Sequence, residues 1–343
     1  MKAGGGFGRH SLRGTVAVLV LFLLALVAAA CGGEGDLSAG GSFSRGSFAN
    51  EHGEREYWLY VPDGRDAGST PLVVMLHGCG QDAEEFATST RMNALAEREK
   101  FLVLYPEQDP GANRSGCWNW FEPSDQERGM GEPSIIAGAT EKVIDEQGVD
   151  PRHVYVAGMS AGGAMSTVLA ATYPELYAAV GVHSGLEYAA ADGAMAAVAA
   201  QKFGGPDPDR QGRLAFESAR PAEARVTPAI VFHGEEDVVV DVVNAHQSLS
   251  QWAQTNDYAD NGADDDVVTD EPDDALPGRV PEGYDYVRYV YEGPEGGVIM
   301  EKWIVEDLGH AWSGGDPEGS FTDPEGPNAS EEMLRFFRQH GGG

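Results

Sequence analysis

The sequence predicts an α/β fold in which a mostly parallel sheet is covered by helices on both faces. Short, continuous apolar runs such as 71–76, 101–105 and 154–157 support this, because the strands of a parallel sheet are buried on both faces. Stretches with helical patterns alternate with these runs, as is typical of a doubly wound sheet. The chain has 343 residues, of which 42% are hydrophobic, so it can form one large domain with a substantial core.

Each element follows from its pattern. The expected strands are, in chain order, 55–61, 71–76, 101–105, 154–157, 178–183 and 228–232, then a hairpin of 286–291 with 298–305. The first strand alternates polar and apolar residues, which indicates an antiparallel strand, whereas the next five are largely apolar. The expected helices are one from Asp82 to about Lys100, 133–147, 189–202 and a final helix with Asn328 and Glu331 as its capping box.

The stretch 154–162 is the most informative, because a short apolar strand runs directly into a G-x-S-x-G motif centred on Ser160. The small residues that follow can begin a helix at once. A sharp strand-to-helix turn of this kind exposes the serine hydroxyl and leaves the next backbone N–H, that of Ala161, facing a developing oxyanion. The alternative is a glycine-rich turn with an incidental serine.

Two later loops can supply an acid and a base. Asp237 follows the strand 228–232, and His310 follows the hairpin. The chain order Ser160, Asp237, His310 is the nucleophile, acid, base order of α/β-hydrolases. An imidazole activates a serine by taking its proton, and a carboxylate fixes the tautomer of the imidazole. Other side chains stay open at this point: Glu235, Glu236 and Asp241 as the acid, and His77, His183, His233 and His246 as histidines that are either structural or catalytic.

The first thirty residues have the pattern of an export signal. Basic residues precede the apolar run 16–27, and three alanines lead to Cys31. The pattern resembles a bacterial lipoprotein signal, which implies that Cys31 is lipidated and becomes the mature N-terminus; secretion without a lipid is the alternative. The apolar run is shorter than the ~20 residues that span a bilayer. Residues 31–50, rich in Gly and Ser, are expected to form a flexible tether.

Beyond this leader the chain has two cysteines, Cys79 and Cys117. Exported proteins meet oxidising conditions, so an even number of cysteines favours a disulfide. The bond would close a loop of about forty residues and stabilise the fold by a few kcal/mol. Two buried free thiols are the alternative.

The net charge is −32, which excludes a general nucleic-acid binder and disfavours adsorption to anionic lipids. We therefore expect membrane contact only through the lipid anchor. The acidic excess is typical of proteins from high salt and equally of an acidic secreted protein. Acidic residues gather in 256–283, an insertion without periodicity that we expect to be exposed and disordered. Its spacing matches no calcium loop, and we expect no metal and no cofactor.

Several motifs occur together in an order that identifies a family. They are the stretches 76–81, 117–121, 158–162, 179–185, 233–237, 309–315 and 319–324. As a set they resemble the poly(3-hydroxybutyrate) depolymerase family of esterases, relatives of feruloyl and acetylxylan esterases, over about residues 55–338. The resemblance implies an α/β-hydrolase fold and a serine carboxylesterase with Ser160, Asp237 and His310 as its triad. The acidic insertion interrupts it.

The resemblance also implies an oxyanion hole formed by the backbone N–H groups of Cys79 and Ala161. Two fixed donors aimed at the tetrahedral oxygen are worth roughly 3–4 kcal/mol each. The expected disulfide would tie this hole to the loop that contains Trp118 and Trp120. These two side chains and Trp312 are candidates to wall the substrate pocket, with ordinary core packing as the alternative.

Together these observations predict one catalytic domain over 51–340 in an extracellular, monomeric protein that is lipid-anchored or secreted and hydrolyses carboxylic esters. The expected substrate is a hydroxyalkanoate oligomer or a small ester. A feruloyl or acetylxylan esterase, a serine peptidase of the same fold and a non-catalytic binding lipoprotein are the alternatives. Because the catalytic fold runs almost to the C-terminus, we expect no adsorbing module, efficient hydrolysis of soluble esters and poor clearing of crystalline polyester.

Overall fold

The computed structural model describes residue 1, residues 40–220 and residues 222–341, so the export signal and Cys31 lie outside the described residues. The strands are β1 (Ser42–Asn50), β2 (Gly53–Val61), β3 (Thr70–Leu76), β4 (Leu102–Pro106), β5 (Val149–Met159), β6 (Ala179–His183), β7 (Ala229–Gly234), β8 (Asp274–Arg279), β9 (Asp285–Glu292), β10 (Val298–Val305), β11 (Trp312–Ser313) and β12 (Thr322–Asp323). The helices are α1 (Ala83–Thr90), α2 (Met92–Glu99), the 3-10 turn η1 (Pro123–Asp125), α3 (Gly131–Gln147), α4 (Ala161–Thr172), α5 (Ala194–Phe203), α6 (Pro208–Ser218), α7 (Val243–Asn261) and α8 (Ala329–Phe337). In these described ranges no helix is both long and apolar enough to cross a bilayer.

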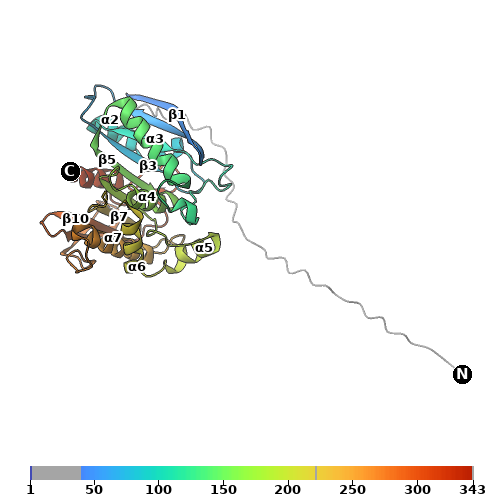
Figure 1. Ribbon diagram of the computed structural model, residues 1–343, viewed down its shortest axis with the longest axis vertical. Coiled ribbons are helices and arrows are strands. Elements are labelled where there is room, and N and C mark those ends of the chain that lie inside the picture. The colour runs from blue at the N-terminus through green and yellow to red at the C-terminus, as the bar shows by residue number, and fades with distance from the viewer. Residues whose placement is uncertain (2–39, 221, 342–343) are drawn as a thin grey trace. The chain divides into compact units, whose positions relative to one another are not determined.

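The sheet has the expected mostly parallel arrangement (Figure 1). Its order in the described part of the chain is β1-β2-β4-β3-β5-β6-β7-β10-β9-β8, and β11 and β12 form a separate small pair. The six neighbouring strands from β4 to β10 are parallel. Antiparallel strands complete both edges, β2 and β1 on one side and β9 and β8 on the other. The predicted α/β-hydrolase fold is therefore confirmed.

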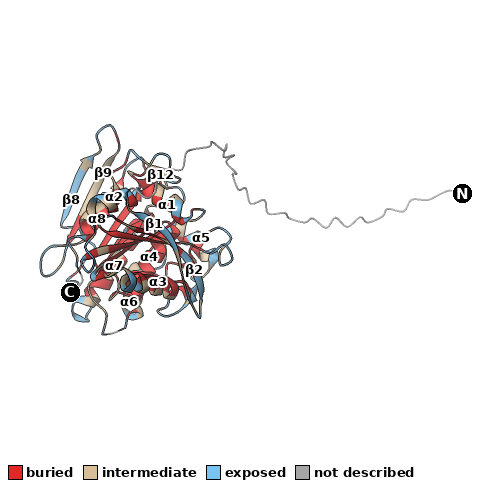
Figure 2. Ribbon diagram, turned by 90° about the horizontal axis from the view of Figure 1, so that it is seen from above, coloured by how far each residue is buried: buried red, intermediate tan, exposed pale blue. Residues whose placement is uncertain are grey.

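Helices cover both faces of the sheet, as the continuous apolar strands require. Helices α3, α4, α6 and α7 pack on one face, and α1, α2 and α8 pack on the other (Figure 2). Strand β3 contributes side chains to the cores on both faces of the sheet. Leu72, Val74 and Leu76 face α3, α4, α6 and α7, whereas Val73 and Met75 face α1, α2 and α8. Successive side chains of a strand point to opposite faces, so a run that is apolar at every position is buried on both.

The carboxyl ends of four parallel strands carry the residues singled out for function. Strand β3 leads into the loop 77–81, and β5 ends immediately before Ser160. Asp237 follows β7, and His310 lies in the loop after β10. Because the carboxyl ends of parallel strands meet at one edge of the sheet, residues far apart in the sequence come together there.

Residues 42–50, which we expected in a flexible tether, instead form β1. This strand pairs along its whole length with β2, and the ring of Phe43 stacks on Trp58 with 4.7 Å between the ring centroids. The folded domain therefore begins before residue 51, the expected boundary. The segment is rich in Gly and Ser, which favours a flexible tether, but it forms an edge strand on which Phe43 packs against Trp58.

The helix expected from Asp82 to about Lys100 is in fact two helices. Arg91 adopts a left-handed conformation with φ 54°, which ends α1 and allows α2 to start in a new direction. Asp82 caps α1 as expected, and its carboxylate accepts the N–H of Glu85 at 2.8 Å. Nothing in the apolar pattern marks the break, because both helices place apolar residues toward the same core.

The acidic segment 256–283 is ordered, contrary to expectation. Helix α7 extends into it, and β8 within it pairs with β9 at the edge of the sheet. Between them, the buried carboxylate of Asp257 accepts four consecutive backbone N–H groups, those of residues 265–268, at 2.7 to 3.2 Å. The side chain of Asp257 thus holds residues 265–268 in a folded loop. The other acidic side chains of the segment repel one another and were expected to keep this loop disordered.

Helices α6 and α7 have no counterpart among the expected elements. Their buried positions are largely small or polar; in α7 these include Asn244, Ser248, Gln251 and Thr255. A helix with a polar buried face shows no apolar stripe, which is the signal on which helix prediction depends. Helix α8, by contrast, starts as predicted, although only half of its capping box forms.

In α8, the side chain of Asn328 accepts the N–H of Glu331 at 3.1 Å. The carboxylate of Glu331 bonds Arg98 instead of the backbone.

Candidate active site

Ser160 lies on the sharp turn between β5 and α4. Its backbone has φ 57° and ψ −121°, which is costly for a residue with a side chain, and its N–H donates to the carbonyl of His183 at 2.9 Å. The neighbouring glycines are needed for space. A Cβ on Gly162 would lie 2.1 Å from the carbonyl oxygen of Leu76, and one on Gly158 would lie 2.5 Å from the backbone of Gly162. The motif therefore folds into the strained turn typical of G-x-S-x-G.

Asp237 and His310 form a close hydrogen-bonded pair. The distance between His310 Nδ1 and Asp237 Oδ2 is 2.7 Å, and Asp237 Oδ1 accepts the N–H groups of Val239 and Val240, each at 2.9 Å. Burial alone would raise the pKa of the Asp237 carboxyl, but the hydrogen bond and charge of His310, together with His233 and the backbone donors, hold this pKa below its usual value. An ionised carboxylate can only accept, so the proton of His310 lies on Nδ1.

The other acids of this loop are placed differently. Glu235 and Glu236 are exposed. Asp241 is exposed as well, and its side chain accepts the N–H of Val243, the first residue of α7, at 3.0 Å. Asp237 is the acid of this group that contacts His310.

The other histidines that the sequence left open are engaged in structural contacts: His77, His183, His233 and His246. The first three are fully buried, and burial lowers the pKa of each, to about 3 for His183. His183 Nε2 accepts the N–H of Ser313 at 3.0 Å, and His233 Nε2 donates to the carbonyl of Val240 at 2.8 Å. His246 Nδ1 accepts from the ammonium of Lys302 at 3.1 Å. These contacts fit neutral, structural imidazoles.

Ser160 and His310 line one cavity of about 200 Å³. Its lining residues are Gly78, Cys79, Gln81, Met159, Ser160, Gln201, Val239, His310 and Phe321. The cavity thus lies at the sheet edge where β3, β5, β7 and β10 end, with α5 contributing Gln201. In the ranges that the structure describes, no three His, Cys, Asp or Glu side chains gather closely enough to hold a metal ion.

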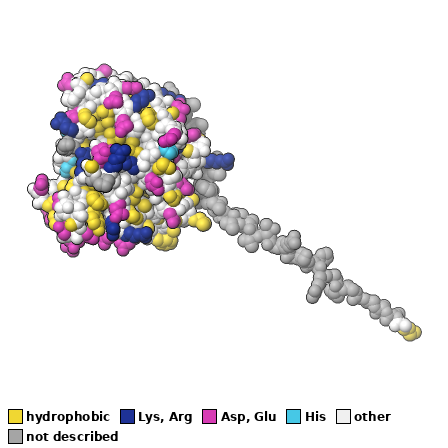
Figure 3. Space-filling view, in the orientation of Figure 1, with side chains coloured by type: hydrophobic (Ala, Val, Ile, Leu, Met, Phe, Trp, Pro, Cys, Tyr) yellow, Lys and Arg dark blue, Asp and Glu magenta, His cyan; other side chains and the backbone are white. Residues whose placement is uncertain are grey.

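An apolar rim borders this cavity. It consists of the exposed side chains of Val238 and Val239, after β7, and of Phe321. Helix α5, which contributes Gln201 to the cavity, exposes Met195, Val198 and Phe203 as well. Val239 and Phe321 also line the cavity itself. Figure 3 shows hydrophobic side chains at the surface on the lower right of the domain, where Figure 1 places α5. The apolar side chains of Val239 and Phe321 are therefore exposed at the cavity that contains the candidate nucleophile.

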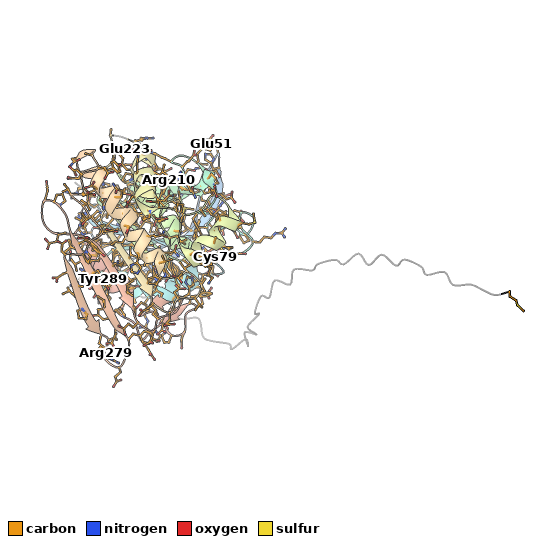
Figure 4. All side chains as sticks on the ribbon, turned by 90° about the horizontal axis from the view of Figure 1, so that it is seen from below. Glu51, Cys79, Arg210, Glu223, Arg279 and Tyr289 are labelled. Atoms are coloured by element: carbon orange, nitrogen blue, oxygen red, sulfur yellow. A yellow bond between two sulfur atoms is a disulfide. The ribbon has the colours of Figure 1, made fainter. Side chains whose placement is uncertain are left out.

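Cys79 and Cys117 form the predicted disulfide, with an S–S distance of 2.07 Å. Cys79, labelled in Figure 4, lines the cavity, and its N–H donates to no protein acceptor among the described residues. Ala161 follows Ser160 and begins α4, whose first N–H groups have no partner within the helix.

The three tryptophans expected to wall the pocket lie in the core instead. Trp118 and Trp312 are fully buried and Trp120 is 3% exposed, and none of them lines the cavity in the described part of the chain. The indole N–H of Trp312 donates to Ser330 Oγ at 3.1 Å, and Trp118 lies beside His77 with 5.4 Å between the rings. The three tryptophans were expected at the pocket because their motifs lie near the candidate site residues in the sequence. Large aromatic side chains also fill a core well, and here they do so.

Sequence reasoning missed most of the cavity wall. Gln81 and Phe321 lie within motifs noticed for the family resemblance, so a signal existed for both. Gln201 and Val239 lie in stretches without a motif. They reach the cavity because α5 docks on the loop after β7, where the N–H of Asp241 donates to the carbonyl of Gln201 at 2.7 Å.

Comparisons with known proteins agree with this arrangement. The chain is 32% identical over 265 residues to the poly(3-hydroxyalkanoate) depolymerase C of Paucimonas lemoignei, covering 77% of this chain and 60% of that protein, so it spans less than two thirds of that relative. It is 29% identical over 213 residues to a feruloyl esterase B of Thermothelomyces thermophilus, covering 58% of this chain and 69% of that protein. An acetyl xylan esterase from Aspergillus awamori superposes with a TM-score of 0.66 at 22% identity, covering 86% of this chain and 99% of that one. The structural likeness supports the fold.

The family assignment rests on a match that includes both the candidate nucleophile and the candidate acid. The family profile described as Esterase PHB depolymerase matches residues 55–271, a range that contains Cys79, Ser160 and Asp237. The match covers more than half of the chain. The protein therefore belongs to the PHB depolymerase family of esterases, as its motifs indicated.

Proposed function

We propose that the protein is a serine carboxylesterase in which Ser160 is the nucleophile, His310 the base and Asp237 the acid that orients the base. One observation carries the proposal: a histidine bonded to a buried carboxylate at 2.7 Å shares a cavity with a serine on a strained strand-to-helix turn. The three residues come from three different strand ends, so the fold, rather than local sequence, brings them together. Membership of an esterase family supports ester hydrolysis as the reaction.

In the proposed mechanism, His310 keeps its proton on Nδ1 against Asp237, and its Nε2 takes the proton of the Ser160 hydroxyl. The serine oxygen attacks the ester carbonyl, and the tetrahedral oxygen accepts hydrogen bonds from the N–H groups of Cys79 and Ala161. His310 then gives its proton to the departing alcohol. A water molecule, deprotonated by the same histidine, releases the acid from the acyl-enzyme.

Two observations support this oxyanion hole. The N–H of Ala161 lies in the first turn of α4, where helical bonding leaves it free and the helix dipole favours negative charge. The N–H of Cys79 lacks a protein acceptor among the described residues, and Cys79 lines the same cavity as Ser160.

As substrate we propose a hydroxyalkanoate oligomer or another small ester. A cavity of about 200 Å³ is below the size typical for drug-sized ligands, which favours a short acyl or hydroxyacyl unit at the reacting carbonyl. Feruloyl and acetylxylan esters are the second candidate, because relatives and a structural neighbour carry those names.

We further propose that the enzyme acts as a monomer outside the cell. The disulfide supports an oxidising compartment. Lipidation of Cys31 rests on the leader pattern alone. Mass spectrometry of the mature N-terminus checks it, because a diacylated cysteine and a free N-terminus after cleavage differ by several hundred daltons.

The proposal is tested with Ser160→Ala on a panel of p-nitrophenyl esters, hydroxybutyrate oligomers, methyl ferulate and acetylated xylan. The variant should keep the wild-type circular dichroism and melting temperature, and kcat should fall by several orders of magnitude. A variant that kept more than about a tenth of the wild-type kcat would remove Ser160 from the mechanism. A wild-type protein that hydrolysed none of the esters would favour the non-catalytic binding lipoprotein.

A further inference from the structure

The loop that carries Cys79, residues 77–81, is held by a second loop, residues 108–119. We call these the oxyanion loop and the disulfide loop. Besides the disulfide itself, the N–H of Gly80 donates to the carbonyl of Ser115 at 2.9 Å. The backbone N–H of Gln108 donates to His77 Nε2 at 3.1 Å. The position of the Cys79 N–H therefore depends on the position of the disulfide loop.

Gln108 links the two loops, because its backbone contacts the oxyanion loop and its side chain contacts the disulfide partner of Cys79. Its backbone bonds His77, two residues before Cys79, and its side-chain amide donates to the carbonyl of Cys117, the disulfide partner, at 2.8 Å. The same amide donates to Glu132 Oε1 at 2.5 Å. Gln108 is 3% exposed, so water does not compete for these bonds.

His77 can serve this contact only as a neutral imidazole. Its Nδ1–H donates to the carbonyl of Gly78 at 2.8 Å, which leaves Nε2 as the acceptor for Gln108. A proton on Nε2 would place two donors against each other. Burial lowers the pKa of His77 and keeps the ring neutral.

The carboxylate of Glu132, in the first turn of α3, is the centre of this network. Its Oε1 accepts from Arg55 at 3.1 Å, from Gln108, and from the side-chain amide of Asn119 at 2.7 Å, while Oε2 accepts the backbone N–H of Asn119 at 2.7 Å. Glu132 is 3% exposed, and Arg55 balances its charge. Every bond to the carboxylate holds either the disulfide loop or the arginine that also bonds Gln108.

A second route leads from Glu132 to the other side of Cys79. The side-chain oxygen of Asn119 accepts from the Asn113 amide at 2.8 Å, and the Asn113 oxygen accepts the N–H of Ser115 at 2.9 Å. The carbonyl of Ser115 in turn accepts the N–H of Gly80. The two routes meet the oxyanion loop before and after Cys79.

We propose that Glu132 is a positioning residue of the esterase reaction, which acts through Gln108 and Asn119 to fix the Cys79 N–H where the oxyanion forms. The inference rests on the proposed function, in which this N–H is an oxyanion donor. Oxyanion donors are effective because they are held in place before charge develops. A buried ion pair is a poor device for stability alone, because well-packed apolar residues stabilise a fold equally well. Fixing the geometry of a loop gives the network a role that apolar packing would not provide.

The test is Glu132→Gln, which keeps the shape of the side chain and replaces one acceptor oxygen with a donor. We expect kcat per active site, counted by the burst of p-nitrophenol, to fall about tenfold or more, with KM within about threefold of wild type. Affinity for a trifluoromethyl ketone, whose adduct oxygen occupies the oxyanion position, should fall by a similar factor. A residue that only stabilised the fold would change neither quantity below the melting temperature.

The matched control is Glu301→Gln. Glu301 is 2% exposed and bonds Arg335 and the indole of Trp303, so it is a buried, arginine-paired carboxylate away from both loops. This variant should lose stability comparably and keep kcat per active site within about twofold of wild type.

The outcomes separate this inference from the proposed function. If Ser160→Ala stays active, the proposed function fails whatever Glu132→Gln does. If Ser160→Ala is inactive while Glu132→Gln keeps its kcat and its affinity for the ketone, the positioning role is overturned. If Glu132→Gln does not fold, Gln108→Met decides by the same two measurements. This variant keeps the volume and removes all side-chain bonds of Gln108, those to Cys117, Glu132, Arg55 and Asp109.

Discussion

The two walls of the candidate active-site cavity are held in different ways. On one side, the oxyanion loop is fixed by a disulfide, by backbone hydrogen bonds and by the buried carboxylate of Glu132 behind them. On the other side, α5 buries only Ala197 and Ala200 and leaves Met195 91% and Phe203 82% exposed. The first wall is held by a covalent bond and by a buried network of hydrogen bonds. The second is held by these two small residues and by hydrogen bonds at the end of α5, where the carbonyl of Gln201 accepts from Asp241 and Asn244.

This difference corresponds to two separate tasks. Stabilising an oxyanion requires donors at fixed positions. Holding an acyl or alcohol group requires apolar surface, and the hydrophobic effect that acts there depends on area and not on direction. Because the bonds from Asp241 and Asn244 end on a backbone carbonyl of α5, the side chains of this wall can change without disturbing the chemistry opposite. Relatives of this chain are named as a poly(3-hydroxyalkanoate) depolymerase, a feruloyl esterase and an acetylxylan esterase. Changes confined to the second wall are one way in which substrate choice can differ within such a family.

Removing the disulfide should break the fixed wall and produce the largest effect. In the Cys79→Ala, Cys117→Ala double variant, we expect the free energy of unfolding to fall by about 2–4 kcal/mol and the melting temperature by about 5–10 °C. We also expect kcat to fall about tenfold or more with little change in KM, because the N–H of Cys79, the proposed oxyanion donor, loses its position. Calorimetry and ester kinetics at 25 °C measure both. A kcat within twofold of wild type would show that hydrogen bonds alone hold the wall.

Raising the pH should loosen the opposite wall through Glu187. This residue is 1% exposed, neither carboxyl oxygen has a partner among the described residues, and Oε1 lies against Gly205, just beyond α5. Burial raises the pKa of Glu187 from 4.5 to about 8. The folded state therefore binds more protons than the unfolded state between these values, and this contribution to stability, present below pH 4.5, is lost as the pH rises toward 8.

Glu187→Gln removes that titration while keeping the shape of the side chain. The stability of the variant relative to wild type should rise by on the order of 2–4 kcal/mol between pH 5 and pH 8. Urea denaturation of both proteins at the two pH values measures the difference. If the difference stays constant with pH, Glu187 is not held neutral behind α5.

Changes in the apolar rim should have the smallest effects and should concern substrate choice. In Val238→Ser and Val239→Ser, we expect kcat for p-nitrophenyl acetate within twofold of wild type, and KM for longer acyl chains raised about three- to tenfold, because each buried methylene is worth about 0.8 kcal/mol. The matched control is Val267→Ser, an exposed valine in the acidic segment. Equal losses for acetate and for long chains would contradict the division of tasks between the walls.

Much of the candidate site could be placed from the sequence, because its signals are local. Ser160, Asp237 and His310 each follow a recognisable strand, and parallel strands end at one edge of the sheet. The disulfide followed from the cysteine count and the export signal. Arg55, by contrast, is 77 residues from Glu132, and no local pattern marks an acid at the start of a helix as the centre of a network.

The errors in the fold have a common physical origin. Sequence patterns report the balance of polar and apolar residues, and several elements here are held by polar bonds. The inner face of α7 is partly polar, and a loop within the segment 256–283 is held by the carboxylate of Asp257. The break between α1 and α2 depends on the left-handed backbone of Arg91, which the polar and apolar pattern does not report either. The tryptophans failed for the opposite reason, because an indole fills a core as readily as it lines a pocket.

The bonds of Asp257 to residues 265–268 also bear on how the protein resists proteolysis. A protease must draw several residues of its target into an extended form before it can cut, so long polar surface loops are the usual points of cleavage. Here the backbone of that stretch is already committed to four hydrogen bonds with a buried acceptor. Digestion must first break these bonds, so cleavage of this loop depends on the population of a locally opened state. One side chain on α7 thus opposes cleavage of this acidic loop by any protease that the protein meets.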